Sequence, residues 1–368
     1  MILVKNMPTT YNFNPGPATL PRSVLSEVKK NFLNWNNSGC SIVEISHRSH
    51  DFIEYTFKVE KNLRYLLDIP NNYCVLFSHG GARGQFSAIP INLSKKSLKP
   101  CYINSGYWSL CAAEESKKYC KPSILDVRKM TKDKKIYIQP TVLWEIPANS
   151  SYLHYCPNET IEGIEIFENP IFYKTVIIGD FSSTILSRKI DIKKYGMIYA
   201  CAQKNIGPTG ITVIIIRKDL LTQINKKTPS ILNYQVLAQS QSMFNTPNVF
   251  SWYVSGLVFQ WMKDLGGIEI IEKKNKEKAK ILYQYLSTTD FYKNFILPVN
   301  QSRMNITFYL PSHELTSIFL QKAEKNGLVG LKGHSMVGGI RASIYNAMPV
   351  KGILLLVDFM KNFEKKFG

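Results

Sequence analysis

The chain has 368 residues, of which 45% are hydrophobic and 20% charged, which is typical of folded globular proteins and excludes a disordered chain. No apolar run reaches the roughly 18 residues that span a bilayer, and the four apolar residues before Lys5 are too few for a signal peptide, so we expect no membrane partner and a cytoplasmic location. The formal charge is +19, but only nine of the 46 basic residues are arginines and the lysines are spread along the whole chain, which favours a solvated basic surface over nucleic-acid binding.

Short apolar segments alternate with helical stretches along the first two thirds of the chain. A helix is predicted over 23–35, and strands over 73–77, 101–104, 175–179, 197–201 and 211–216. Several of these strands do not alternate apolar and polar residues, which is typical of strands buried on both faces of a mostly parallel sheet. The pattern predicts an α/β fold.

A second unit is predicted after Gly266 and Gly267. A long Lys/Glu-rich helix follows the two glycines, with Ile271, Ala279, Leu282 and Leu286 on one face. Beyond it, a helix over about 313–326 separates two strands, over 303–310 and 339–345. We expect a small α+β domain there.

Two segments have the features of ligand sites. In 73–86 a strand runs into the Gly-rich turn HGGARGQF and then a helix. Backbone N–H groups of this turn could approach an anion, with Arg83 as a fixed cation. A tight turn without a ligand explains the motif equally well. Asp180 directly follows the strand over 175–179, where open α/β sheets bind ligands, although it could instead cap the next turn.

Lys204 lies between two apolar strands and precedes a Gly-Pro turn. Desolvation there would lower its pKa and make its amine a nucleophile that forms Schiff bases, whereas a lysine that reaches out to solvent is the alternative. Together, an anion cradle, an aspartate and a lysine at strand ends are what a pyridoxal phosphate enzyme needs to hold phosphate, pyridine nitrogen and aldehyde.

Over nearly its whole length, the sequence resembles the phosphoserine aminotransferases, which belong to the class V group of fold-type I pyridoxal phosphate enzymes. The matching motifs are NFNPGPATLP (12–21), EISHRSHDF (44–52), HGGARGQF (79–86), NSGYWS (104–109), HYCPNETIEG (154–163), DFSSTILSR (180–188), AQKNIGP (202–208), PSILNY (229–234), MFNTPN (243–248), KGH (332–334) and GGIRASIYNAM (338–348).

The resemblance implies a large domain with a mostly parallel, seven-stranded-type sheet flanked by helices. We divide the chain into a cofactor-binding domain over 22–267, a small C-terminal domain over 268–368, and an N-terminal segment over 1–21 associated with the small domain and the active site. The implied reaction is transfer of an amino group between glutamate and 3-phosphohydroxypyruvate, giving O-phospho-L-serine and 2-oxoglutarate in serine biosynthesis. A related role with 4-phosphohydroxy-L-threonine in pyridoxine biosynthesis is implied as well.

The resemblance also assigns cofactor and substrate residues. Lys204 would form the Schiff base with pyridoxal 5′-phosphate, and Asp180 would bind its pyridine nitrogen. The other cofactor residues would be Ala82, Arg83, Trp108, Thr160 and Gln203, with Asn245 and Thr246 reaching the phosphate from the neighbouring subunit of a homodimer. His47, Arg48, His334 and Arg341 would bind substrate carboxylate and phosphate, a task suited to the bidentate arginine fork.

Three positions depart from the family pattern. Ala82 replaces a common glycine of the phosphate loop, and its methyl group is tolerable where φ is negative. Ser335 stands where bacterial members often have arginine, which removes one cation from the phosphate site. Pro15 stands where some members have a serine that approaches the amino-acid substrate.

Alternative functions remain open from the residues. Another class V enzyme is possible, either an alanine–glyoxylate type transaminase or a cysteine desulfurase. A desulfurase needs a nucleophilic cysteine in a late loop, and none follows Cys201.

The seven cysteines are odd in number and lack CxxC spacing, so free thiols are expected. His47 and His50 have HxxH spacing but no third ligand nearby, so we expect no metal.

Overall fold

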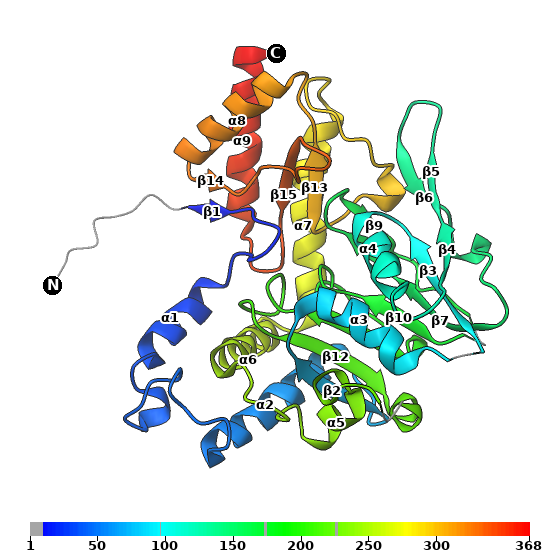
Figure 1. Ribbon diagram of the computed structural model, residues 1–368. Coiled ribbons are helices and arrows are strands. Elements are labelled where there is room, and N and C mark those ends of the chain that lie inside the picture. Colours follow the sequence, from blue (N-terminus) through cyan, green and yellow to red (C-terminus); the bar gives the residue numbers. More distant parts are fainter. Residues whose placement is uncertain (1–9, 96, 173–174, 225–226) are drawn as a thin grey trace.

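The structure is a computed structural model that describes residues 10–95, 97–172, 175–224 and 227–368. A seven-stranded sheet in the order β2-β12-β11-β10-β7-β3-β4 forms its centre (Figure 1). The strands are β2 (Tyr73–Ser78), β3 (Lys99–Asn104), β4 (Ser123–Asp126), β7 (Ser150–Tyr155), β10 (Ile177–Asp180), β11 (Met197–Cys201) and β12 (Thr212–Arg217). Strand β12 is antiparallel to both of its neighbours, and the other neighbouring pairs are parallel. The predicted α/β fold with a mostly parallel sheet is confirmed.

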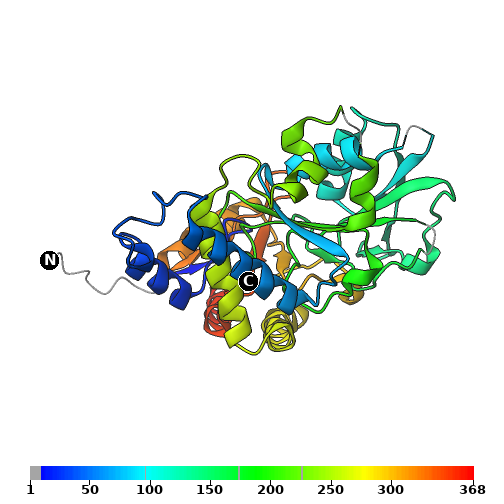
Figure 2. The ribbon, with the colours of Figure 1, turned by 90° about the horizontal axis from the view of Figure 1, so that it is seen from below.

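Helices cover both faces of this sheet, which explains why most of its strands are apolar on both faces (Figure 2). One face packs against α3 (Gly81–Leu93), α4 (Tyr107–Ser116) and α5 (Tyr234–Gln239); the other packs against α1 (Arg22–Asn31), α2 (His50–Leu67) and α6 (Val249–Asp264). The successive β11 residues Ile198 and Tyr199 belong to cores on opposite faces. Both faces are therefore removed from water, as a parallel sheet requires.

A second hydrophobic core lies among α7 (Ile268–Ser287), α8 (His313–Lys325) and α9 (Val350–Phe367). Two short sheets accompany it: antiparallel β13 (Asn305–Phe308) with β15 (Ile340–Ser343), and parallel β1 (Tyr11–Asn12) with β14 (Leu328–Val329). Helix α7 joins the two cores, since Ile271 packs in the sheet core and Leu282 in the second. The division of the chain at residue 267 stays a prediction, and residues 1–9 of the predicted N-terminal segment lie outside the described residues.

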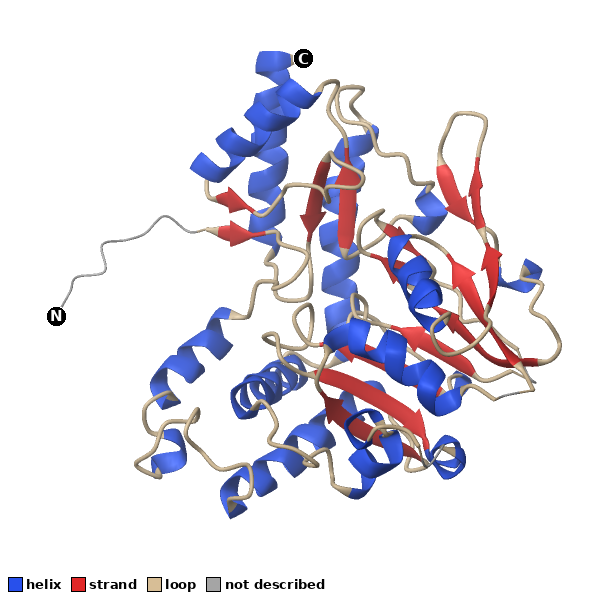
Figure 3. Ribbon diagram, viewed as in Figure 1, coloured by secondary structure: helices blue, strands red, loops and turns tan. Residues whose placement is uncertain are grey.

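The remaining elements are short (Figure 3). They are β5 (Arg128–Met130), β6 (Ile136–Ile138), β8 (Asn158–Glu159), β9 (Ile164–Glu165) and the 3₁₀ helices η1 (Trp35–Asn37), η2 (Thr141–Leu143), η3 (Ile192–Lys194), η4 (Lys218–Gln223), η5 (Ser230–Leu232) and η6 (Pro298–Asn300). Within the described ranges, no helix combines the length and apolar character that crossing a bilayer requires.

One predicted helix is shorter than expected. The sequence predicts a helix over 23–35, but α1 ends at Asn31 and Trp35 begins a separate 3₁₀ turn. The Asn31 side chain donates back to the Glu27 carbonyl (3.1 Å), and Trp35 is buried edge-on against the rings of Phe52 and Tyr55. Burial of the indole against α2 outweighs continuation of the helix.

Candidate active site

A cavity of about 250 Å³ opens at the carboxyl ends of β7, β10 and β11, beside the start of α3. Ligands of open α/β sheets bind at this edge because the loops that follow the strands converge there. Seven of the predicted cofactor residues line it: Ala82, Arg83, Trp108, Thr160, Asp180, Gln203 and Lys204. The fold thus brings together residues more than 120 positions apart in the chain.

The Lys204 amine lies inside this cavity, where its Nζ donates to the Thr160 hydroxyl at 2.6 Å. The sequence-based expectation of a lowered pKa is wrong. Burial lowers the pKa of Lys204, but Tyr345, Cys201 and Asp180 raise it, and the net pKa lies above its ordinary value. The amine is therefore an ammonium at neutral pH and must lose a proton before it can act as a nucleophile.

Asp180 ends β10 with a side chain that is 6% exposed. Its Oδ1 accepts hydrogen bonds from the Ser182 N–H (3.0 Å) and the Ser182 hydroxyl (2.5 Å). Burial raises the pKa of Asp180 although Ser182 and Lys204 lower it. The aspartate thus caps a local turn and lines the cavity as well, so the two roles considered for it coexist.

The Gly-rich turn lines the cavity at the start of α3. Gly80 precedes α3 with φ +87°, a conformation that favours glycine, and none of the described side chains caps the N–H groups of the first helical turn. Ala82 lies within that turn, so its methyl group fits a helical backbone. The free N–H groups and the helix dipole suit an anion. The Arg83 guanidinium lies 5.4 Å from the Trp108 ring and adds a cation.

Two predicted substrate residues lie beside the cavity. Arg341 is 6% exposed; its Nη1 donates to the Thr160 carbonyl (3.3 Å), and its Nε has no hydrogen-bond partner among the described residues. Burial lowers the pKa of Arg341, yet the group stays charged because its ordinary pKa is so high. The His334 ring lies 5.6 Å from the Tyr107 ring, next to Trp108.

Besides Arg341 and His334, four predicted residues do not line the cavity of their own chain: His47, Arg48, Asn245 and Thr246. Arg48, Asn245 and Thr246 are exposed, and His47 is half-buried. They lie in the loops that precede α2 and α6.

The sequence analysis missed several lining residues: Cys156, Asn158, Ser182, Ser183 and Cys201. Ser182 and Ser183 could have been found, because they lie two and three residues after the strand-end Asp180. Burial raises the pKa of Cys156 and of Cys201, so both thiols face the cavity as neutral groups. Neither is the reactive thiolate that a desulfurase requires.

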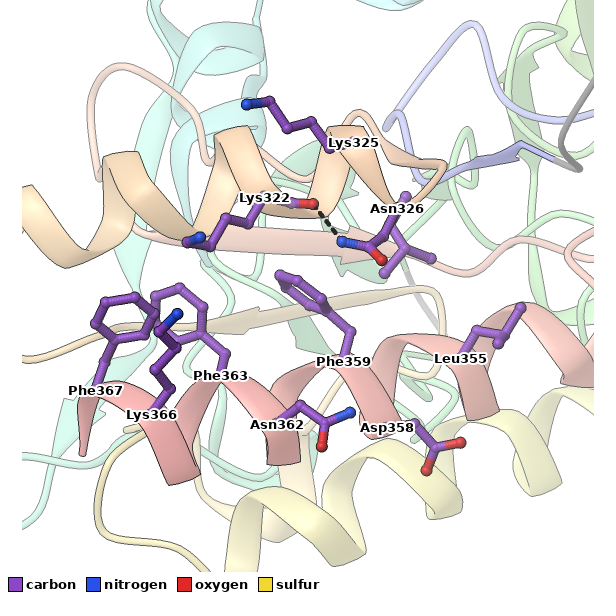
Figure 4. A pocket seen from close by; sticks show the side chains of 11 residues that line it. Lys322, Lys325, Asn326, Leu355, Asp358, Phe359, Asn362, Phe363, Lys366 and Phe367 are labelled. Carbon is purple, nitrogen blue, oxygen red and sulfur yellow. Dashed lines mark hydrogen bonds between the residues drawn. The ribbon is translucent and has the colours of Figure 1, made fainter.

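A larger cavity of about 460 Å³ lies between α8 and α9, in the second core (Figure 4). Phe359, Phe363 and Phe367 lie along one wall, and the ammonium groups of Lys322 and Lys366 lie within 6 Å of the Phe367 ring centre. These lysines are engaged with an aromatic face. The groups able to do covalent chemistry gather in the smaller cavity.

The smaller cavity fits pyridoxal 5′-phosphate by its donor set. The uncapped α3 terminus with Arg83 matches a phosphate, the buried Asp180 matches a protonated ring nitrogen, and the Lys204 amine matches an aldehyde. Fold and site therefore define an enzyme of the pyridoxal phosphate-dependent, fold-type I class.

Comparisons with known proteins agree with this class. The family described as Aminotransferase class-V matches residues 10–356. The chain is 70% identical to a phosphoserine aminotransferase of Buchnera aphidicola subsp. Cinara cedri, over 98% of this chain and 100% of the relative. Among solved structures it is similar to a phosphoserine aminotransferase studied for radiation damage of its Schiff base (40% identity, TM-score 0.94, 98% and 100% covered) and to the PLP-bound enzyme of Trichomonas vaginalis (36%, 0.90, 96% and 99%). The chain belongs to the class-V aminotransferase family.

Proposed function

We propose that this chain is a pyridoxal phosphate-dependent phosphoserine aminotransferase, which moves an amino group reversibly between glutamate and 3-phosphohydroxypyruvate. The observation that carries the proposal is the convergence of Lys204, Asp180 and the α3 start on one cavity, in a chain that is 70% identical to a phosphoserine aminotransferase over its full length. The additional reaction in pyridoxine biosynthesis stays a prediction.

In this proposal each residue has a defined task. The cofactor, when bound, supplies an electron sink for the bonding pair released at the substrate Cα. Lys204 would hold the cofactor aldehyde through its amine and would carry a proton from and to the substrate Cα, and the Thr160 hydroxyl keeps its Nζ in place. Asp180 holds the proton on the ring nitrogen. Trp108 covers the ring and excludes water, and the α3 N–H groups with Arg83 and Gln203 hold the phosphate.

Arg341 is proposed to bind the substrate carboxylate. Its partnerless Nε, in a side chain fixed by the Thr160 carbonyl, leaves part of the guanidinium fork free for a bidentate contact. His334 is proposed to lie near the other anionic end of the substrate, since its ring packs against Tyr107 beside Trp108.

The active site is proposed to be shared across a homodimer. His47, Arg48, Asn245 and Thr246 lie outside their own cavity, and exposed apolar side chains flank both loops: Val43 is 54% and Phe244 is 48% exposed. In a homodimer, the second copy would cover these apolar side chains. The four residues of the first copy would then reach into the cavity of the second. A cytoplasmic location is part of the proposal, supported by seven cysteines without a disulfide.

A visible absorption spectrum tests the proposal most directly. The purified protein, loaded with pyridoxal 5′-phosphate, should show the yellow band of the lysine-bound cofactor. O-Phosphoserine should bleach this band to the absorption of the amino form, whereas serine should not. Bleaching by both amino acids would overturn the phosphate selectivity, and the absence of any band would overturn the assignment of Lys204.

A further inference from the structure

The start of α4 is held by two glutamates from a single turn. The Trp108 and Ser109 N–H groups donate to the two carboxylate oxygens of Glu159, each at 2.9 Å, and the Tyr107 N–H donates to Glu162 at 2.8 Å. Glu159 is fully buried. The first three N–H groups of the helix, which have no intrahelical acceptor, are thus all satisfied by carboxylates about 50 residues further along the chain.

Gly106 allows this close approach. A Cβ atom at this position would lie 2.6 Å from Cγ and 2.7 Å from Cδ of Glu159. The backbone before α4 therefore packs directly on the carboxylate. This close packing fixes the position of the helix start relative to Glu159.

The same turn contacts two further groups of the cavity. Between the glutamates, the Thr160 hydroxyl accepts from Lys204 and the Thr160 carbonyl accepts from Arg341. Residues 159–162 therefore connect Trp108, Lys204 and Arg341, which come from three distant parts of the sequence.

The Trp108 ring is not fixed by its own polar atom. Its Nε1 is buried and has no hydrogen-bond partner among the described residues. The orientation of the indole therefore depends on the helix start that carries it, on packing against the Tyr107 ring (5.3 Å) and the sheet core, and on the Arg83 cation 5.4 Å away.

Placing two carboxylates together in the interior is unfavourable. Burial, followed by the charge of Glu159, raises the pKa of Glu162 to about 7. The hydrogen bonds from the three α4 N–H groups offset part of this cost, which ties the two glutamates to the start of the helix.

We propose that Glu159 is a positioning residue that fixes the Trp108 ring over the cofactor cavity through the backbone N–H groups of Trp108 and Ser109, with Glu162 securing Tyr107. The proposal rests on the proposed function, specifically on Trp108 as a cofactor contact. Glutamine at 159 has a single acceptor oxygen, so it can satisfy only one of the two N–H groups and turns an NH₂ group towards the other.

A double-mutant cycle tests the proposal, with binding of pyridoxal 5′-phosphate to the apoprotein as the readout. Glu159→Gln should weaken cofactor binding about tenfold in the wild-type background and leave it unchanged in the Trp108→Ala background, because the ring through which it acts is gone. Glu114→Gln, at an exposed position of the same helix, is the matched control and should have no effect.

The outcomes distinguish a failure of the positioning proposal from a failure of the proposed function. An equal loss in both backgrounds would mean a merely structural role and overturn the positioning proposal. If Trp108→Ala itself leaves cofactor binding unchanged, the assignment of Trp108 under the proposed function fails. Should Glu159→Gln not yield folded protein, the same cycle is measured with Glu162→Gln. Weaker cofactor binding in the wild-type background alone supports the proposal. Equally weaker binding in the wild-type and Trp108→Ala backgrounds, or no weakening in either, overturns it.

Discussion

Lys278 is a buried ammonium that should make stability depend on pH. It lies on α7 with a side chain that is 1% exposed, and its Nζ donates to the carbonyls of Ile344 (2.9 Å) and Tyr345 (2.7 Å). Burial, with a small contribution from Lys274, lowers its pKa to about 7.

The direction in which stability changes with pH follows from the number of protons that each state binds. The unfolded chain has a lysine pKa of about 10.4, so between about pH 7 and 10.4 the folded state binds fewer protons than the unfolded state. The penalty of burying the charge is fully present below about pH 7 and disappears as the pH rises through this window. With about 1.4 kcal/mol per pKa unit, stability should rise by about 1.4 kcal/mol per pH unit, and by about 4 to 5 kcal/mol in total.

Urea unfolding of the wild type and of Lys278→Met at pH 7, 8 and 9 measures this effect. At pH 7 the variant should be the more stable by about 2 to 3 kcal/mol, because it is free of a charge penalty of about 4 to 5 kcal/mol and loses two hydrogen bonds of about 1 kcal/mol each. At pH 9 the wild type should have gained about 2 to 3 kcal/mol relative to the variant. Lys276→Met, at a position 61% exposed, should keep a constant difference from the wild type. A difference between wild type and Lys278→Met that does not change from pH 7 to 9 would refute the reasoning.

Three further substitutions test the site. Lys204→Ala should leave a folded protein that binds pyridoxal 5′-phosphate without covalent attachment and has lost activity; normal turnover would remove Lys204 from catalysis. Arg341→Lys should raise KM for glutamate and for O-phosphoserine by about tenfold or more, since a point charge replaces a fork, and an unchanged KM for both would exclude Arg341 from the site. Gly106→Ala should lower the free energy of unfolding by about 1 to 3 kcal/mol because its Cβ overlaps Glu159; a wild-type thermal midpoint would contradict the close packing.

Local patterns in the sequence predicted the sheet and the centre of the cavity. The buried strands are mostly apolar and end at a polar residue, as β10 does at Asp180 and β2 at Ser78. Because parallel strands end at one edge, residues that follow them lie close together without any knowledge of distant contacts. The same reasoning put Lys204 at the edge of the sheet that holds Asp180, and both residues line the cavity.

Contacts between distant segments were beyond this reasoning. Glu159 interacts with N–H groups about 50 residues away, and no periodicity marks it. The pKa of Lys204 was predicted with the wrong sign because only desolvation was considered, whereas Tyr345, more than 100 positions later, opposes it. The early end of α1 likewise depends on the packing of Trp35 against α2 and α6.

The separation of the site residues into two groups leads to a last prediction. The α3 start supplies phosphate donors from its own chain, whereas Asn245 and Thr246 lie outside that cavity and, in the proposed dimer, belong to the partner's site. The dimer then offers the cofactor more donors than the monomer, so cofactor binding and dimerisation must strengthen each other by the same factor. Sedimentation equilibrium should give a smaller dimer dissociation constant with pyridoxal 5′-phosphate than without it, and Asn245→Ala should reduce the difference. Equal dissociation constants in the two states would contradict a shared phosphate site.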